Sequence, residues 1–162
     1  MCDKRSLLAA LILAIHCLHT VQVHAAEPAV TAIRGSCRVF SGPNSGTAFF
    51  VAPGDPATVG RKCLLITAAH VMESLGGEKC TVAFRASVAN QQFERRPVEF
   101  PIRKDNAPLW VRHPVLDIAV LGVELPEGID VHVYSEEQLA TEKLAEEGKV
   151  TPGQHVWIPC FP

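Results

Sequence analysis

Signals for several common kinds of site are missing from this sequence of 162 residues. No Cys-x-x-Cys pair occurs, and the histidines beyond residue 26 show neither His-x-x-x-His nor His-Glu-x-x-His spacing, so no metal site is predicted. The glycine-bearing turn at residues 42–46 lacks the Gly-Lys-Ser/Thr ending of a phosphate-binding loop. Charged residues are dispersed and the formal net charge is −2, so nothing favours nucleic acid or an anionic membrane as a partner. We expect no metal and no cofactor.

A long apolar run is also missing outside the N-terminus, where residues 1–25 are typical of a secretory signal peptide. Lys4 and Arg5 supply the positive region, and Leu7–Ile15 is an apolar core too short to span a membrane comfortably. Cleavage is expected after Ala25, with Ala26 as a neighbouring option. We therefore expect a secreted or periplasmic protein that is free of the membrane once the signal is removed. The cysteines that remain, at positions 37, 63, 80 and 160, could form disulfides in that compartment.

Short apolar segments separated by glycine and proline turns follow the signal. Strands are predicted over residues 31–40, 47–52, 62–67, 80–85, 92–103 and 117–125, and a short helix is predicted over residues 68–75. Pro97 and Pro101 favour an edge position or a bulge for the fifth strand. Six short strands with turns between them indicate an all-β domain, built as a closed or nearly closed antiparallel barrel.

The pattern changes after Leu125. A helix is predicted over Ser135–Glu147, with Ser135 as its N-cap, acidic residues in its first turn and Gly148 after its end. Residues 154–161 are predicted to form one more strand. The chain therefore divides into a signal peptide at 1–25, a first β-barrel at 26–125, and a connector with an additional strand at 126–162.

Two motifs carry the candidate chemistry. Residues 63–70, Cys-Leu-Leu-Ile-Thr-Ala-Ala-His, form an apolar strand that ends at His70, and residues 113–121, His-Pro-Val-Leu-Asp-Ile-Ala-Val-Leu, place Asp117 at the head of a second. Each residue alone is more often structural. Together, a carboxylate held away from water can accept from one imidazole nitrogen, which fixes the tautomer and favours the imidazolium formed in proton transfer. We predict that His70 and Asp117 are catalytic and lie within about 3.5 Å of each other.

These motifs resemble those of trypsin-like serine peptidases. Residues 66–71, Ile-Thr-Ala-Ala-His-Val, resemble the histidine motif of that family, and residues 116–121, Leu-Asp-Ile-Ala-Val-Leu, resemble its aspartate motif. Residues 45–51 resemble the glycine-bearing second strand of bacterial relatives, and residues 153–162 resemble the first strand of a second barrel. Val71 stands where animal trypsins have the cysteine of their histidine-loop disulfide, which favours a bacterial-type enzyme.

The resemblance covers roughly residues 30–162 and implies a fold of two six-stranded Greek-key barrels, with the active site between them. The first barrel supplies the histidine and the aspartate, and the second supplies the serine and the oxyanion-hole amides. His70 would then act as general base and general acid, and Asp117 would orient it, in a serine endopeptidase that cleaves proteins or peptides.

The nucleophile is the missing part of this machinery. No Gly-x-Ser-Gly follows Asp117, so the serine is expected beyond Pro162, and residues 1–162 alone are expected to be inactive. Ser45, in Asn-Ser-Gly-Thr, precedes His70 and is interpreted as a turn residue. The alternative is a catalytically inactive protease-like barrel that acts as a binding protein or is a degenerate remnant. A Gly-Asp-Ser-Gly-like stretch encoded past Pro162 would favour the enzyme.

The resemblance also implies a disulfide. In the family's topology the first and fourth strands are neighbours, and Cys37 and Cys80 lie on the corresponding predicted strands. Cys37–Cys80 is therefore the expected pair, with Cys63–Cys80 as the alternative. Cys160 is expected to face the second barrel.

Overall fold

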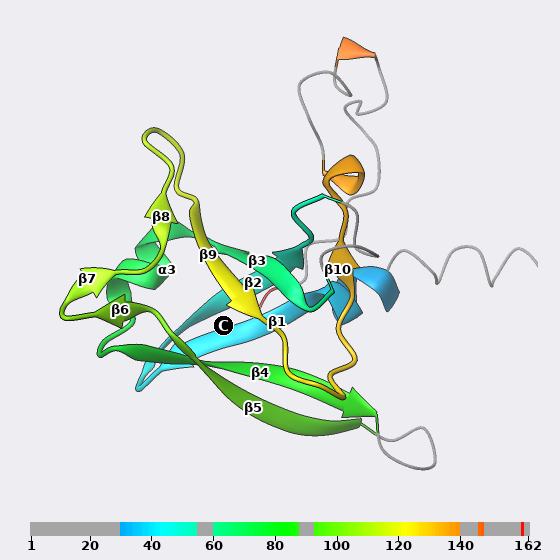
Figure 1. Cartoon of the computed structure of the whole chain (residues 1–162), viewed down its shortest axis with the longest axis horizontal. Helices are drawn as coiled ribbons and strands as arrows, with labels where there is room; N and C mark the ends of the chain where they lie inside the picture. Colours follow the sequence, from blue (N-terminus) through cyan, green and yellow to red (C-terminus); the bar gives the residue numbers. More distant parts are fainter. Residues whose placement is uncertain (1–29, 55–59, 88–92, 140–145, 148–159, 161–162) are drawn as a thin grey trace, which may run out of the picture.

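The computed structural model describes residues 30–54, 60–87, 93–139, 146–147 and 160, which form a mainly antiparallel β-sheet protein (Figure 1). The longer strands are β1 (Ser36–Ser41), β2 (Asn44–Val51), β3 (Lys62–Thr67), β4 (Lys79–Ser87), β5 (Phe93–Pro101) and β9 (Ala119–Glu124). Four strands have two residues each: β6 (Arg103–Lys104), β7 (Ala107–Pro108), β8 (Val111–Arg112) and β10 (Val133–Tyr134). A short helix, α3 (Ala69–Ser74), follows β3, and η2 (Glu136–Gln138) is a single 3-10 turn. The predicted all-β class is confirmed.

One continuous sheet has the strand order β5-β4-β1-β2-β3-β9-β8, and β10 pairs in parallel with β2. The remaining strands, β6 and β7, form a separate hairpin. The β1–β4 pairing confirms the expected neighbours, and β5, which contains Pro97 and Pro101, lies at the sheet edge as predicted. In Figure 1 the sheet curves around an interior. A pairing of β5 with β9, which would close the curve, is not present in the part of the chain that the structure describes.

Alternate side chains of the longer strands point into one core. The Phe50 and Phe84 rings stack with 5.5 Å between their centroids, and Phe100 meets Phe84 edge-on at 6.2 Å. Full burial of one such side chain contributes about 1.5–3 kcal/mol. Because the three rings come from β2, β4 and β5, this cluster joins strands from different parts of the curved sheet.

The first strand starts later than predicted, so the expectation of a strand over residues 31–35 is wrong. Residues 30–35 are helical, and the Ser36 hydroxyl donates a hydrogen bond to the Ala32 carbonyl oxygen at 2.8 Å. The buried Gly35 lies against the Tyr134 ring, where an added Cβ would be 2.4 Å from the hydroxyl oxygen. The Tyr134 ring therefore packs directly on the backbone of Gly35, at the point where the helix ends and β1 begins.

The helix predicted over Ser135–Glu147 begins after Ser135 as a 3-10 turn that ends at Gln138, and Glu146, near its predicted end, is helical. The Ser135 amide donates to Gln138 Oε1 at 2.9 Å, and the Gln138 amide donates to the Ser135 carbonyl oxygen at 3.1 Å. Bonding to the third residue rather than the fourth makes the turn 3-10. Residues 140–145 and the expected stop at Gly148 lie outside the described residues, as do the signal peptide and the strand predicted over 154–161. None of the described helices is long and apolar enough to cross a membrane.

The expected disulfides are absent, because Cys37, Cys63, Cys80 and Cys160 are all free thiols. The β1–β4 register pairs Arg38 with Ala83, which leaves Cys37 roughly 13 Å along β1 from the position opposite Cys80. A disulfide needs Cα atoms within about 7 Å. The alternative pair fails because β3, which carries Cys63, does not neighbour β4. Cys160 is exposed.

Candidate active site

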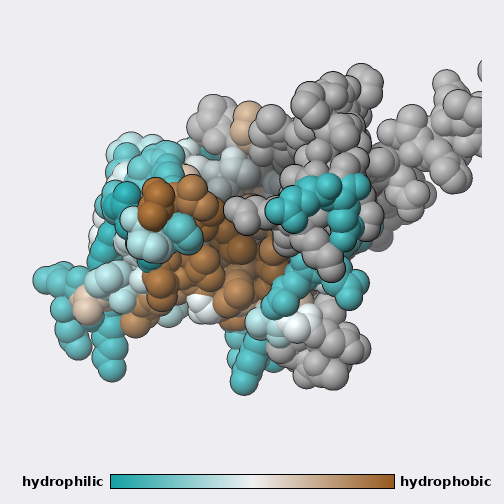
Figure 2. Space-filling model, turned by 90° about the horizontal axis from the view of Figure 1, so that it is seen from above, coloured by the Kyte–Doolittle hydropathy of each residue, from teal (hydrophilic) through white to brown (hydrophobic). Residues whose placement is uncertain are grey.

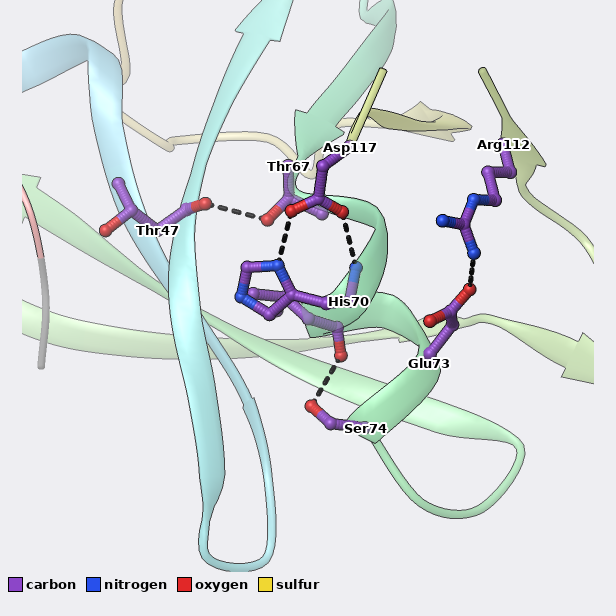
Figure 3. A network of polar contacts seen from close by, with 8 residues as sticks. Thr47, Thr67, His70, Glu73, Ser74, Arg112 and Asp117 are labelled. Atoms are coloured by element: carbon purple, nitrogen blue, oxygen red, sulfur yellow. Dashed lines mark hydrogen bonds and ion pairs between the residues drawn. The ribbon is translucent and has the colours of Figure 1, made fainter. Parts of the chain in front are cut away.

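The two residues predicted to be catalytic meet where the paired strands β3 and β9 end (Figure 3). Thr67, the last residue of β3, pairs with Ala119, the first residue of β9. His70 is the second residue of α3, directly after β3, and Asp117 lies in the bend before β9. Strand pairing therefore brings together two side chains that are 47 positions apart in the sequence.

Three contacts join the bend to the start of α3. His70 Nδ1 lies 2.5 Å from Asp117 Oδ2, the His70 amide donates to Asp117 Oδ1 at 2.9 Å, and the Ala69 amide donates to the Asp117 carbonyl oxygen at 3.3 Å. The predicted proximity is confirmed. The hydrogen bond from the His70 ring, followed by the one from its amide, lowers the pKa of Asp117 below its ordinary value. The carboxylate is therefore anionic at neutral pH.

The expected shielding of Asp117 from water is not observed. The His70 side chain is 70% exposed and the Asp117 side chain is 51% exposed. Because Asp117 occupies Nδ1, Nε2 is the nitrogen available to a reacting hydroxyl group. The neighbouring hydroxyls of Thr67 and Ser74 donate to backbone carbonyl oxygens, at 2.8 Å each (Figure 3).

Arg103 holds the far end of the helix that carries His70. Its Nη1 donates to the carbonyl oxygens of Leu75 at 2.6 Å and Gly77 at 3.0 Å, and its Nη2 donates to that of Met72 at 3.0 Å. The last carbonyl groups of a helix have no partner within the helix. One guanidinium group therefore satisfies the C-terminal side of α3 and limits how far the helix can rotate.

Two further contacts fix α3 against strands. Arg112 of β8 forms an ion pair with Glu73, and Asn44 Nδ2 at the start of β2 donates to the Ser74 carbonyl oxygen at 2.6 Å. Sequence reasoning did not identify these contacts or Arg103. No local pattern marks them, because each joins residues at least 26 positions apart.

His113 organises the bend that presents Asp117. Its ring Nδ1 accepts hydrogen bonds from the amides of Val115 at 3.2 Å and Leu116 at 2.9 Å. Its own amide donates to the Ile118 carbonyl oxygen at 2.8 Å. The His-Pro pair could have drawn attention to this turn, since a histidine nitrogen is a good acceptor for amides two and three positions later. The ring thus supports the backbone that carries Asp117.

Close packing of β2 on α3 depends on Gly46. A Cβ built at this position would lie 2.6 and 2.7 Å from the two methyl carbons of Val71. The backbone there is not in the left-handed region, so the requirement for glycine is one of space rather than of conformation. Since Val71 follows His70 directly, the distance between β2 and α3 also determines where the imidazole lies.

Ser45, the serine that the sequence offered as an alternative nucleophile, is a strand residue. It lies in β2 beside the β1–β2 turn, and its hydroxyl oxygen accepts a hydrogen bond from Arg38 Nη2 at 3.1 Å. The interpretation of Ser45 as a turn residue is wrong, because the turn consists of Gly42 and Pro43 and Ser45 pairs with Phe40 as the second residue of β2.

Apolar side chains are exposed in the Asp117 bend and in the segment that precedes it. Leu109, Val111, Val115 and Leu116 are between 45% and 84% exposed. Figure 2 shows an apolar area in the middle of the face seen from above. Exposed apolar surface that borders a functional group often marks a contact with another protein segment.

The described residues hold no group of three or more His, Cys, Asp or Glu side chains that could bind a metal ion. The chain matches no protein-family model, no curated protein and no solved structure.

Proposed function

We propose that this chain supplies the general base and its orienting acid to a trypsin-like serine endopeptidase that is exported from the cell. The observation that carries the proposal is the contact between His70 Nδ1 and Asp117 Oδ2 at 2.5 Å, which leaves Nε2 open to solvent. In the reaction, Nε2 takes the proton of a serine hydroxyl as the oxygen attacks the peptide carbonyl carbon. The imidazolium then gives this proton to the leaving amine.

Asp117 has an orienting role in this proposal. Its carboxylate accepts from Nδ1, which leaves Nε2 unprotonated in the neutral ring and stabilises the imidazolium during the reaction. The amides of Ala69 and His70 keep the bend and the carboxylate in place. An amide side chain at position 117 would favour the wrong tautomer, and a change of this kind lowers kcat by about 10⁴-fold in a well-studied serine protease.

The serine and the oxyanion-hole donors would come from a second barrel beyond Pro162. The exposed apolar side chains around the Asp117 bend support a covering segment at this place. The strand order supports the proposed Greek-key barrel, because a pairing of β5 with the part of β9 beyond its contact with β8 would close the sheet.

The test uses the complete polypeptide encoded by the gene that contains this sequence, with hydrolysis of fluorescently labelled casein as the readout. We expect His70→Ala to lower the rate by about 10⁶-fold and Asp117→Asn by about 10⁴-fold. Asp105→Asn is the matched control, because it makes the same change of charge in the exposed β6–β7 turn. Hydrolysis that survives His70→Ala at the wild-type rate would refute the proposal.

A further inference from the structure

A second candidate site lies on the outer side of the sheet, away from the His70–Asp117 pair. A pocket of about 420 Å³ is formed there by residues of β1, β4 and β5. Three arginines line it, Arg38, Arg85 and Arg95, and Glu94 supplies its one carboxylate. The volume is within the range of about 300–1,000 Å³ that is usual for small-molecule sites. The proposed peptidase activity makes no use of these residues.

Arg85 and Arg95 are placed against each other by the sheet itself. They are directly opposite in the antiparallel β4–β5 pairing, and like charges in that relation destabilise a sheet. Neither guanidinium group forms an ion pair with a carboxylate among the described residues. No ion pair within the described part of the protein therefore offsets this repulsion, and a bound anion would do so.

Two of the guanidinium groups are already positioned by an aromatic ring. Arg38 and Arg95 have their central carbons 5.5 and 5.4 Å from the centroid of the Phe40 ring. Contacts of this kind favour a fixed orientation of the cation over the ring. Arg38 Nη2 also donates to Ser45, while its buried Nε has no acceptor. A ligand would therefore meet arginines that have lost part of their freedom before binding.

We propose that this pocket binds a small anion that carries phosphate or sulfate groups. Guanidinium groups present paired N–H donors that match the oxygens of such groups, and three cations face one carboxylate. Ala83 adds apolar surface to the wall, which suits an ester with an organic part better than a bare ion. The site is independent of the catalytic role proposed above.

Binding is tested by calorimetry on the full chain, with inorganic pyrophosphate and phenyl phosphate as probes at low ionic strength. Arg85→Gln and Arg95→Gln are each expected to weaken binding by at least about tenfold, which is the loss of one charge-assisted contact. Glu94→Gln is expected to strengthen it. Lys104→Gln removes the same charge from exposed β6, outside the pocket, and is expected to change the dissociation constant by less than about twofold.

Thermal unfolding of the same proteins gives a second readout. Without anion, Arg95→Gln is expected to unfold at a higher temperature than wild type, because the cross-strand repulsion is gone. Pyrophosphate is expected to raise the midpoint of wild type more than that of Arg95→Gln at the same concentration. Absence of binding by wild type, or equal losses in Arg85→Gln and Lys104→Gln, would overturn the proposal.

Vesicles of phosphatidylcholine with and without phosphatidylglycerol distinguish the source of the phosphate. Binding to the anionic vesicles that is lost in Arg85→Gln would identify a lipid headgroup as the ligand. Binding of phenyl phosphate without binding to vesicles would identify a free ester. Both results depend on the same arginines and both support the site.

Discussion

Replacing Gly46 by alanine inserts a methyl group between β2 and α3. The new carbon would lie 2.6 and 2.7 Å from the Val71 methyl carbons, where ordinary carbon contacts are about 3.5–4.0 Å. The two elements must therefore separate by roughly 1 Å, or Val71 must leave its rotamer. Overpacking of this kind costs about 1–3 kcal/mol. Because alanine restricts the unfolded chain, about 0.4–1 kcal/mol is regained, and we expect a net loss of about 1–2 kcal/mol.

The sign of this effect should reverse when Val71 is shortened. Val71→Ala alone removes two buried methyl groups and is expected to cost about 1–3 kcal/mol. In that background the methyl group introduced at position 46 enters the space left by the valine side chain. Gly46→Ala is then expected to stabilise the protein by about 0.4–1 kcal/mol, because only the effect on the unfolded chain and the filled cavity remain.

Urea unfolding of the four proteins, followed by circular dichroism, measures this cycle. The expected coupling free energy between positions 46 and 71 is at least about 1.5 kcal/mol, within the range of values for residues in contact. Gly122→Ala is the control, because that glycine is also in a strand and an added Cβ there meets nothing within 4 Å. Additive effects of the two substitutions would show that Gly46 is not required by the Val71 contact.

Three further predictions concern the thiols, the Asp117 bend and the end of α3. Burial raises the pKa of Cys37 to about 12 and that of Cys63 and Cys80 to about 11, so above pH 9 only the unfolded state loses these protons. The free energy of unfolding should then fall as the pH rises, by up to about 1.4 kcal/mol per pH unit for each thiol. In urea titrations from pH 8 to 10.5, Cys37→Ala should show a smaller decrease than wild type. An unchanged slope would contradict this prediction. His113→Phe removes the acceptor of two amides and should lower kcat of the complete polypeptide with little change in KM. His113→Asn keeps an acceptor and should have a kcat between those of wild type and His113→Phe. Equal kcat values in the two variants would refute the positioning role of His113. Arg103→Met leaves three carbonyl groups without their donor and should destabilise the protein by about 1.5–3 kcal/mol in urea, and a loss below about 0.5 kcal/mol would show that water replaces the guanidinium group.

Strongly patterned segments of the fold could be predicted from the sequence. The bounds predicted for β3, residues 62–67, are those observed. The strand is an apolar run, and a turn before it and a helix of small residues after it mark both of its ends. The β6–β7 hairpin was missed, since strands of two residues show no period. Its turn, with positive φ at Asp105 and Asn106, is a recognisable two-residue signal.

The disulfide could not be predicted, because strand register cannot be read from the cysteine positions. The neighbours β1 and β4 were expected correctly, yet an offset of four residues separates Cys37 from Cys80. Periodicity says which face a residue occupies and does not say how far one strand is shifted along another.

In the candidate site, too, the sequence motifs could be recognised but the contacts between distant segments could not. His70 and Asp117 were identified from short motifs, and pairing of β3 with β9 explains why two strand ends coincide. The supports of the pair, Arg103 and the contact of Gly46 with Val71, could not be seen. They depend on the position of α3 over β2, which follows from the packing of the whole sheet.

The proposed role of His70 is tested most directly by trapping the nucleophile. The complete polypeptide encoded by the gene is treated with a fluorophosphonate, which modifies serines activated by a general base, and the modified residue is identified by peptide mass spectrometry. We expect one modified serine, located after Asp117 in the chain, and a loss of labelling by several orders of magnitude in His70→Ala. Labelling of Ser45, or labelling that persists in His70→Ala at the wild-type rate, would contradict the assignment of His70 as the general base.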